Sequence, residues 1–372
     1  MWVLILGTLA TQLGLLLYNL AYWRRRGLSP AVPSSQRSAG LPRLSILIPA
    51  RNEMGNLPRL LESLAPQLGD GVECWVCDDG SDDGTTEWLE CHAERLGVQW
   101  FRSAPRPAEW VGKNWACYQL AVRAQGEWLL FLDADVYGKH GFINAIRAYL
   151  AGTDAQLVSA IPTFAPTSLS VALLKLMVPF SVFTLLPLFL AETHPNPAFA
   201  FANGQFLALR KHDYARWLPH FFVRDAVLED VALAALVKRH GGIVRILDAR
   251  AWLTVSMYPT LREAIDGFAK NAVAICRTLP MAVFVSAMLL LVYWYPLGAW
   301  LLASSQRGLA TMAILAAVAI FGLSARVVGL PFRLGWLYVG SVFLGVGTLA
   351  RSMLWYRRGT VRWKGRVYRA RL

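Results

Sequence analysis

EWLLFLDAD, residues 127–135, is an apolar run that ends in two aspartates. Side chains alternate along a strand, so Asp133 and Asp135 point the same way if this run is a strand. Two carboxylates at a strand end form an oxygen-rich site of the kind that binds Mg²⁺ or Mn²⁺ together with phosphate oxygens. An Asp-x-Asp motif also occurs as a solvated acidic turn, so its interpretation depends on the surrounding sequence.

The segments around this run alternate between short β-rich runs and helical stretches. The β-rich runs are LSILIP (44–49), VECWVCD (72–78), VQWFR (98–102) and QLVSAI (156–161). The helical stretches between them cover residues 56–68, 84–96, 112–125 and 139–150. Such alternation is typical of a parallel sheet covered by helices, which binds ligands beyond the carboxyl ends of its strands. We therefore predict an α/β fold with a mostly parallel sheet.

Two more polar clusters follow strands of this predicted sheet. PARNE (49–53) ends the first strand, and DDGSDDGT (78–85) ends the second. Carboxylates in such positions accept hydrogen bonds from the base or ribose in other nucleotide folds. Each cluster alone also fits a turn with a helix N-cap, and Asp82 or Thr85 has that simpler interpretation. The chain contains neither GxGxxG nor GxxxxGK[ST], which weakens dinucleotide and P-loop interpretations.

The composition is that of a membrane protein. Hydrophobic residues make up 55% of the chain and charged residues 16%, and the net charge is +13. The basic residues lie beside apolar runs, as RRR at 24–26 and in the tail from Arg357 onward. That placement follows the positive-inside rule and differs from the basic face of a nucleic-acid binder. We therefore expect the lipid bilayer, and no nucleic acid, as a partner.

The first apolar run, residues 2–22, is long enough to span a bilayer. Its positive charge follows it, whereas a cleaved signal peptide carries that charge in front. We predict an uncleaved anchor (1–23) with its N-terminus outside, then a basic, flexible linker (24–42) and a cytoplasmic catalytic domain. The chain would thus be a multi-pass protein of the cell membrane.

Four further apolar runs follow, at 168–191, 279–302, 309–323 and 334–350. The first contains a lysine and two prolines, and a crossing there would move the rest of the domain across the membrane, so we expect an interfacial segment. Residues 276–356 are predicted to form transmembrane or re-entrant helices. If all three C-terminal runs crossed, the basic tail (357–372) would lie outside. We therefore expect one re-entrant run, or two forming an incomplete hairpin, and a cytoplasmic tail.

The ordered set LSILIPARNE, VCDDGSDDGT and LLFLDAD resembles the nucleotide-sugar-binding half of the family 2 glycosyltransferases, which have the GT-A fold. The resemblance covers about 40–275, and we place the catalytic domain at 43–275. It implies that Glu53 and an aspartate of the second motif help to hold the donor nucleotide. It also implies that Asp133 and Asp135 bind nucleotide and metal. Further candidates for the donor side are Pro49, Arg51, Asp78 and Asp79, and which of the two aspartates contacts the base is left open.

The run EWVGKNWA (109–116) resembles the GK-containing segment that lies between the second motif and the Asp-x-Asp motif in this family. The resemblance implies that Lys113 offers a positive charge to the phosphates or sugar of the donor. A surface lysine at a helix start is the simpler alternative.

Two later motifs also resemble the family: ANGQ (202–205) and VLEDV (227–231). The first implies that Gly204 and Gln205 border the acceptor. The second implies that Asp230 is the catalytic base, supported by Glu229, which would take a proton from the acceptor hydroxyl. Two acids at a helix N-terminus, favoured by the helix dipole, are the structural alternative.

The chain departs from the processive synthases of this superfamily, because it lacks a QxxRW motif. The resemblance therefore implies transfer of a single sugar. The stretch GFAKN (267–271) and the tail VRWKGRVY (361–368) resemble the carotenoid- and hopanoid-associated branch of the family. Lys270 in this stretch is a candidate for the acceptor side or the diphosphate, or an interfacial lysine.

Together these features predict an inverting glycosyltransferase that uses Mg²⁺ or Mn²⁺ and a nucleotide sugar, UDP-glucose-like by resemblance alone. The acceptor is expected to be a membrane lipid, first a carotenoid or related isoprenoid, with a polyprenyl phosphate or glycerolipid as the alternative. An inactive membrane scaffold is the alternative from another class. Intact Asp133, Asp135 and Asp230 argue against that alternative.

Overall fold

The computed structural model describes residues 1–28 and 40–368, and the chain divides into two compact units. The sheet unit comprises Trp23–Thr163 and Phe189–Ser256. The helical unit comprises Met1–Tyr22, Phe164–Leu188 and Met257–Leu372. Residues 29–39 of the predicted linker and 369–372 of the predicted basic tail lie outside the described residues.

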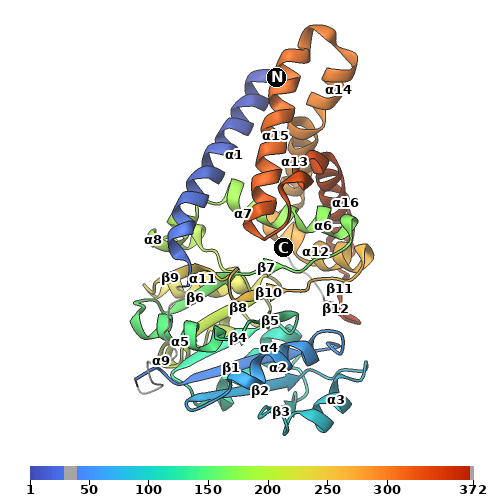
Figure 1. The fold of residues 1–372 in the computed structure, drawn as a ribbon. Coiled ribbons are helices and arrows are strands. Elements are labelled where there is room, and N and C mark those ends of the chain that lie inside the picture. The colour runs from blue at the N-terminus through green and yellow to red at the C-terminus, as the bar shows by residue number, and fades with distance from the viewer. Residues whose placement is uncertain (29–39, 369–372) are drawn as a thin grey trace. The chain divides into compact units, whose positions relative to one another are not determined.

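A seven-stranded sheet forms the centre of the sheet unit (Figure 1). Its order is β3 (Gln99–Arg102), β2 (Val72–Asp78), β1 (Leu44–Ala50), β4 (Trp128–Leu132), β8 (Phe206–Arg210), β6 (Leu157–Ile161) and β9 (Val244–Asp248). β1, β2, β3 and β4 run parallel, as do β6 and β9, while β8 is antiparallel to both of its neighbours. β4 is buried along its whole length, so it reads as a continuous apolar run. The predicted α/β fold with a mostly parallel sheet is confirmed.

Helices connect the strands and pack on the sheet (Figure 1). They include α2 (Leu57–Leu64), α3 (Thr85–His92), α4 (Gly112–Arg123), α5 (Phe142–Gly152), α9 (Lys211–Trp217), α10 (Pro219–Phe222) and α11 (Glu229–Arg239). Leu120 of α4 and Leu233 and Val237 of α11 are buried in one cluster with Leu129 and Phe131 of β4. This shared core fixes the starts of α4 and α11 next to the end of β4, where the predicted site residues lie.

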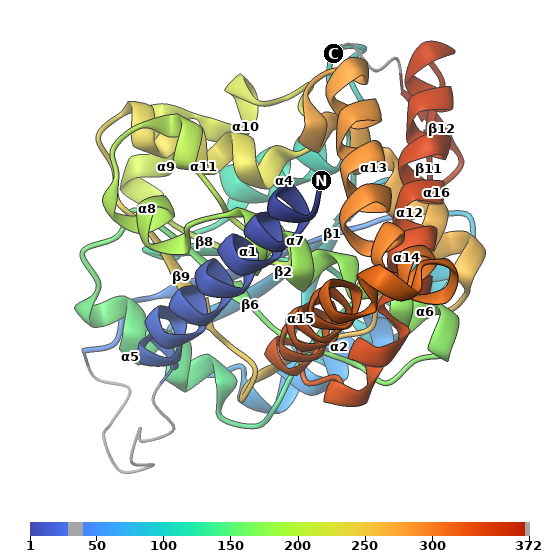
Figure 2. The same cartoon turned by 90° about the horizontal axis from the view of Figure 1, so that it is seen from above.

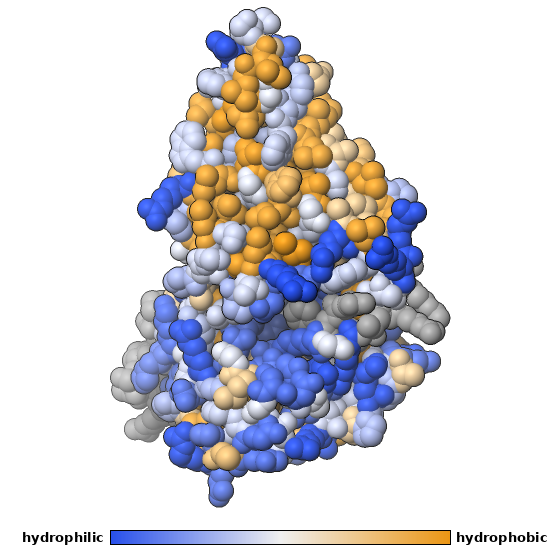
Figure 3. Space-filling model, turned by 90° about the vertical axis from the view of Figure 1, so that its right-hand side faces the viewer, coloured by the Kyte–Doolittle hydropathy of each residue, from blue (hydrophilic) through white to orange (hydrophobic). Residues whose placement is uncertain are grey.

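The helical unit is built from segments of both ends and the middle of the chain (Figure 1, Figure 2). Its helices are α1 (Trp2–Trp23), α6 (Leu169–Lys175), α7 (Met177–Leu185), α12 (Leu261–Cys276), α13 (Leu279–Tyr293), α14 (Tyr295–Leu302), α15 (Arg307–Val327) and α16 (Tyr338–Arg357). A hairpin of β11 (Val361–Trp363) and β12 (Arg366–Tyr368) follows. Apolar side chains cover much of the face of this unit that Figure 3 shows.

Four stretches of the described residues are long and apolar enough to cross a membrane, by length and composition. They are Trp2–Arg26, Leu279–Leu302, Ser304–Val327 and Phe332–Arg357. The predicted apolar segments at the two ends of the chain are thus helices with the dimensions of membrane anchors.

The apolar segment predicted to be interfacial, 168–191, contains the short helices α6 and α7, and its helical part, Leu169–Leu185, is shorter than these four stretches. The buried side chain of Asn19 holds the end of α7, since its Nδ2 donates to the carbonyl oxygen of Phe183 at 2.9 Å. The Asn19 Oδ1 accepts from the N–H of Leu188 at 3.1 Å. The interfacial placement itself remains a prediction.

The residues that follow α1 are held by the sheet unit. The turn η1 (Arg24–Arg26) continues the helix, and Arg26 forms a 2.9 Å ion pair with the buried Glu192. Gly27 then forms a bridge with Asp248 of β9. These residues are therefore fixed within the sheet unit by an ion pair and a backbone contact.

Candidate active site

Lys113 lies between two of the predicted motifs at the carboxyl end of the sheet. It is the second residue of α4, and its Nζ lies 2.6 Å from Oδ1 of Asp133 and 2.6 Å from Oε1 of Glu229. Asp133 follows β4 and Glu229 begins α11. Burial lowers the pKa of Lys113, but the charges of the two carboxylates outweigh burial and raise its pKa well above the ordinary value. The lysine is therefore a fixed positive charge between two carboxylates.

Asp230, the predicted base, is oriented by two backbone donors. Its Oδ2 accepts from the N–H of Gly204 at 2.9 Å, and its Oδ1 accepts from the N–H of Val231 at 2.8 Å. Burial and the charge of Glu229 together raise the pKa of Asp230 to about 6, although Lys113 and the two backbone donors oppose the rise. A carboxyl group with a pKa near the operating pH is suited to general-base work.

Gly204 and Gln205, predicted to border the acceptor, lie beside these acids. A Cβ at Gly204 would lie 3.2 Å from Oδ2 of Asp230 and 3.2 Å from Oε1 of Glu229, so a larger residue would displace them. The carbonyl oxygen of Gln205 accepts a 3.3 Å hydrogen bond from the N–H of Asp133. The loop before β8 thus contacts both the Asp-x-Asp motif and the acids of α11.

Asn114 supports the site, although no sequence pattern singled it out. It is fully buried beside Lys113, and its Nδ2 contacts the carbonyl oxygens of Val223 (2.8 Å), Arg224 (3.3 Å) and Ala226 (3.1 Å). These carbonyls belong to the loop that leads into α11. The side chain therefore ties the start of α4 to the segment that delivers the two acids.

The buried His220 packs beside β4, and the sequence predicted no catalytic role for it. His220 packs on Phe131 of β4, and its Nδ1 is 2.9 Å from the hydroxyl of Tyr214. Burial lowers the pKa of His220 to about 3, so the imidazole is neutral at physiological pH. We assign it a packing role under the strand that carries Asp133.

The two predicted donor loops, after β1 and β2, are joined to each other. Arg51 donates from Nη1 to the carbonyl oxygens of Asp79 and Gly80, both at 2.6 Å. The side chains of Asn52 and Asp82 form a 2.7 Å hydrogen bond across the same gap. These contacts hold the loop that contains Pro49, Arg51 and Glu53 next to the second motif, DDGSDDGT (78–85).

Asp78 and Asp79 have different surroundings. Asp78 is fully buried, and its Oδ1 accepts from the N–H (3.1 Å) and hydroxyl (2.6 Å) of Ser81. Its Oδ2 accepts from the hydroxyl of Thr86 at 2.7 Å. Asp79 is 6% exposed, and its backbone carbonyl is the group that Arg51 holds. Both oxygens of Asp78 are therefore engaged in shaping the loop.

Asp135 follows Asp133 by two residues, and its carbonyl oxygen accepts a 2.8 Å hydrogen bond from the N–H of Ser256. Among the described residues no cluster of three or more His, Cys, Asp or Glu side chains forms a ready metal site. Lys270 lies on α12, in the helical unit, and its predicted role remains a prediction.

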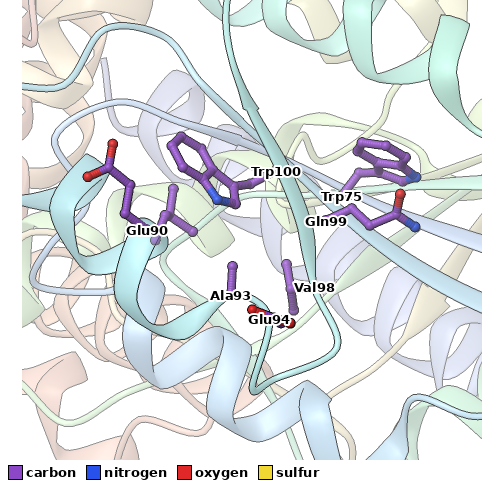
Figure 4. Close-up of a pocket in the computed structure, with 8 residues that line it drawn as sticks. Trp75, Glu90, Ala93, Glu94, Val98, Gln99 and Trp100 are labelled. Atoms are coloured by element: carbon purple, nitrogen blue, oxygen red, sulfur yellow. The ribbon is translucent and has the colours of Figure 1, made fainter.

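A hollow of about 480 Å³ lies elsewhere in the sheet unit (Figure 4). It is lined by Trp75 of β2, by Gln99 and Trp100 at the start of β3, and by Glu90 and Glu94 at the end of α3 and just beyond it. The polar clusters lie at the carboxyl ends of the strands, whereas this hollow is beside the middle of β2 and the amino end of β3. It is therefore separate from the candidate active site.

Comparison with known proteins identifies the class of protein. Residues 45–189 match the model of the glycosyl transferase family 2. These residues contain the two donor loops, Lys113 and the Asp-x-Asp motif. This stretch is therefore a family 2 glycosyltransferase domain, and the predicted fold class, a GT-A domain with apolar helices at both ends, is confirmed.

Several individual proteins are similar to this chain. A 4,4'-diaponeurosporenoate glycosyltransferase of Staphylococcus haemolyticus is 28% identical over 293 residues, which is 77% of this chain and 74% of the relative. The protein of that name from Staphylococcus aureus strain MRSA252 is 33% identical over 130 residues, 35% of this chain and 31% of the relative. A solved mannosyltransferase of Pyrobaculum calidifontis, in complex with GDP-Man and Mn²⁺, is 17% identical with a TM-score of 0.49, covering 94% of this chain and 98% of that one.

Proposed function

We propose that this enzyme transfers a single sugar from a nucleotide sugar to an isoprenoid lipid of the carotenoid type. The observation that carries the proposal is the position of Lys113 between Asp133 and Glu229. The ammonium group of Lys113 contacts both Asp133, which is predicted to bind the donor, and Glu229, which is predicted to support the base on the acceptor side. Glycosyl transfer requires those two sides to meet at one point.

The name of the Staphylococcus relatives supports the acceptor class, because 4,4'-diaponeurosporenoate is a carotenoid carboxylate. The apolar helices support it as well, since a lipid acceptor reaches the enzyme from the bilayer. We propose that the helical unit is embedded in the cell membrane, with the N-terminus outside and the sheet unit on the cytoplasmic side. RRR at 24–26, next to the sheet unit, agrees with that orientation.

A divalent cation fits the donor side of the site. Asp133 and Asp135 offer hard oxygen ligands at a strand end, and Mg²⁺ or Mn²⁺ needs few protein ligands when phosphates and waters supply the rest. Bound by the two aspartates, such an ion supplies charge stabilisation to a departing diphosphate.

For the nucleotide we propose Asp79 over Asp78, with Glu53 beside it. Both carboxylate oxygens of Asp78 accept hydrogen bonds from Ser81 and Thr86, which leaves that side chain committed to the loop. Arg51 fixes the backbone of Asp79 and so sets the position from which its side chain meets the base.

In the proposed reaction the acceptor oxygen attacks the anomeric carbon as the bond to the diphosphate breaks, which inverts that carbon. With a hydroxyl acceptor, Asp230 takes the proton, and its pKa of about 6 leaves it ionised at neutral pH. With a carboxylate acceptor, the oxygen is already ionised and Asp230 has no proton to remove. We propose that Lys113 faces the phosphates of the donor.

The test uses membranes that contain the protein, labelled UDP-glucose, and Mg²⁺ or Mn²⁺, with the lipid extract as the readout. Asp230→Asn is compared with Asp225→Asn, a matched change at an exposed position of the preceding loop. Labelling lost only in Asp230→Asn supports a hydroxyl acceptor with Asp230 as the base. Labelling retained in both variants supports a carboxylate acceptor. Absence of label with all common nucleotide sugars, in the presence of carotenoid lipids, would contradict the proposal.

A further inference from the structure

β5 (Val136–Gly138) is the short strand that directly follows Asp135, the second aspartate of the Asp-x-Asp motif. On one edge it pairs antiparallel with β10 (Leu253–Val255), and the N–H of Ser256 donates to the carbonyl oxygen of Asp135 at 2.8 Å. A strand of three residues forms few backbone hydrogen bonds. Further contacts are therefore needed to fix this strand and the aspartate in front of it.

α2 supplies such contacts through a row of polar side chains beside β5 (Figure 1). Arg59, Ser63 and Gln67 follow one another at intervals of four residues, so they lie along one side of α2 and of the turn η2 (Ala65–Gln67) that continues it. We call these three residues the polar row. The leucines of α2 are buried in the core: Leu57, Leu60, Leu61 and Leu64. The polar row is therefore carried by a helix whose own position is fixed by packing.

The first two members of the polar row contact successive residues of β5. The guanidinium group of Arg59 lies over the ring of Tyr137, with Cζ 3.5 Å from the ring centroid, a cation–π contact. The hydroxyl of Ser63 accepts from the N–H of Gly138 at 3.1 Å and donates to the carbonyl oxygen of Leu60 at 2.7 Å. Because its one proton is used within the helix, the Ser63 oxygen is oriented to accept from the strand.

The third member, Gln67, extends the contacts to the start of α5. Its Nε2 donates to the carbonyl oxygens of Ser63 at 2.8 Å and Lys139 at 3.1 Å, and its Oε1 accepts from the N–H of Ile143 at 3.4 Å. Ile143 lies in the first turn of α5, where the N-cap residue, Gly141, has no side chain that could accept from the free N–H groups. The polar row thus contacts three successive residues after the Asp-x-Asp motif and the beginning of the next helix.

The opposite end of α2 begins at the first donor loop. The carbonyl oxygen of Glu53 accepts from the N–H groups of Asn56 at 2.9 Å and Leu57 at 2.8 Å, and its Oε2 accepts from Nδ2 of Asn56 at 3.0 Å. The N–H of Glu53 donates to the hydroxyl of Thr85 in the second motif at 3.0 Å. α2 is therefore a short, rigid connection between the loop predicted to hold the nucleotide and the strand that follows Asp135.

We propose that the polar row of α2 positions Asp135 for the divalent cation and couples the cation site to the nucleotide loop. This inference rests on the proposed function, which assigns the cation to Asp133 and Asp135 and the nucleotide to Asp79 and Glu53. Asp133 is held separately, by Lys113 and by the loop before β8, so loss of the polar row displaces one ligand of the cation and spares the other. Because α2 contacts both sites, cation and nucleotide each bind more tightly when the other is present, and this coupling is reciprocal.

Direct binding of Mn²⁺ to the purified full chain in detergent tests the inference. The electron paramagnetic resonance signal of the free ion is followed without nucleotide, with UDP and with GDP. Ser63→Ala removes the acceptor for the N–H of Gly138 and is expected to weaken Mn²⁺ binding roughly tenfold in the presence of the nucleotide. Ser63→Thr keeps a hydroxyl and is expected to bind Mn²⁺ nearly as tightly as the wild type. Glu62→Ala, at an exposed position of the same helix, is the matched control.

Arg59→Met tests the inference at a position where loss of the fold is not expected, because Arg59 is exposed. This variant is expected to weaken Mn²⁺ binding and to reduce the gain in Mn²⁺ affinity that the nucleotide brings. Its thermal unfolding midpoint without ligands is expected to stay near that of Glu62→Ala. A merely structural role of the polar row would lower the unfolding midpoint and leave the Mn²⁺ affinity of the folded protein unchanged.

Two results would count against these assignments, and they are distinguishable. Wild-type Mn²⁺ affinity in both Ser63→Ala and Arg59→Met, measured on folded protein, would overturn the positioning role while the cation site stands. Absence of Mn²⁺ binding by the wild-type chain, with either nucleotide, would overturn the cation assignment of the proposed function and the positioning role with it.

Discussion

The backbone N–H of Gly204 donates a 2.9 Å hydrogen bond to Oδ2 of Asp230. This contact joins the loop before β8 to the first turn of α11, and it depends on the absence of a side chain at residue 204. A Cβ there would lie 3.2 Å from both Asp230 and Glu229, closer than ordinary van der Waals contact. The glycine thus sets the position of both acids.

Gly204→Ala is expected to lower kcat about tenfold, because both acids must move by a few tenths of an ångström and transfer is sensitive to such displacement. Gly152→Ala is the matched control, since a Cβ at that position meets nothing within 4 Å. Steady-state kinetics with both variants checks this. Equal activity of Gly204→Ala and the control would show that the close approach has no catalytic importance.

Lys113→Met is expected to shift the pH dependence of the reaction. Asp230 must be ionised to accept a proton, so with a hydroxyl acceptor kcat/KM falls as the pH drops through about 6. Lys113 lowers the pKa of Asp230, so its removal raises that pKa and moves the acid limb of the profile to higher pH. Lys113→Arg keeps the charge and is expected to leave the limb near pH 6. Loss of activity in Lys113→Met without movement of the limb would indicate a structural role.

The sequence predicted the strands and the polar groups at their ends because both are local features. A buried strand such as β4 can be recognised from its run of apolar residues, and Asp133 and Asp135 follow this run directly. The contacts of Lys113 with Asp133 and Glu229 join motifs far apart in the chain, so spacing alone did not reveal them. The role of Asn114 could not be predicted from local sequence, because its side-chain amide donates to backbone carbonyl oxygens that lie 109 to 112 residues later in the chain.

Asn114→Ala is expected to destabilise the protein by about 1–3 kcal/mol, since it leaves buried carbonyls of the loop before α11 without their donor. Asn144→Ala, at an exposed position of α5, is the control and is expected to be near neutral. Thermal unfolding of the purified protein in detergent measures the difference. A midpoint for Asn114→Ala equal to that of the control would remove the amide from the structural account of the site.

Asp78→Ala is expected to lower stability and Asp79→Ala to weaken donor binding, although the two residues are adjacent. Asp78 is buried and accepts hydrogen bonds from Ser81 and Thr86 with both oxygens. Its removal leaves those donors unpaired in the interior and is expected to cost about 2–4 kcal/mol of stability.

Asp79→Ala is expected to lose less stability than Asp78→Ala and to raise KM for the nucleotide sugar, because the proposed contact of Asp79 is with the donor base. Arg51 binds the backbone of Asp79, so the loop keeps its main anchor when the side chain is removed. Unfolding curves and donor KM values for both variants separate the roles. A raised KM with normal stability in Asp78→Ala, and the reverse in Asp79→Ala, would exchange the two assignments.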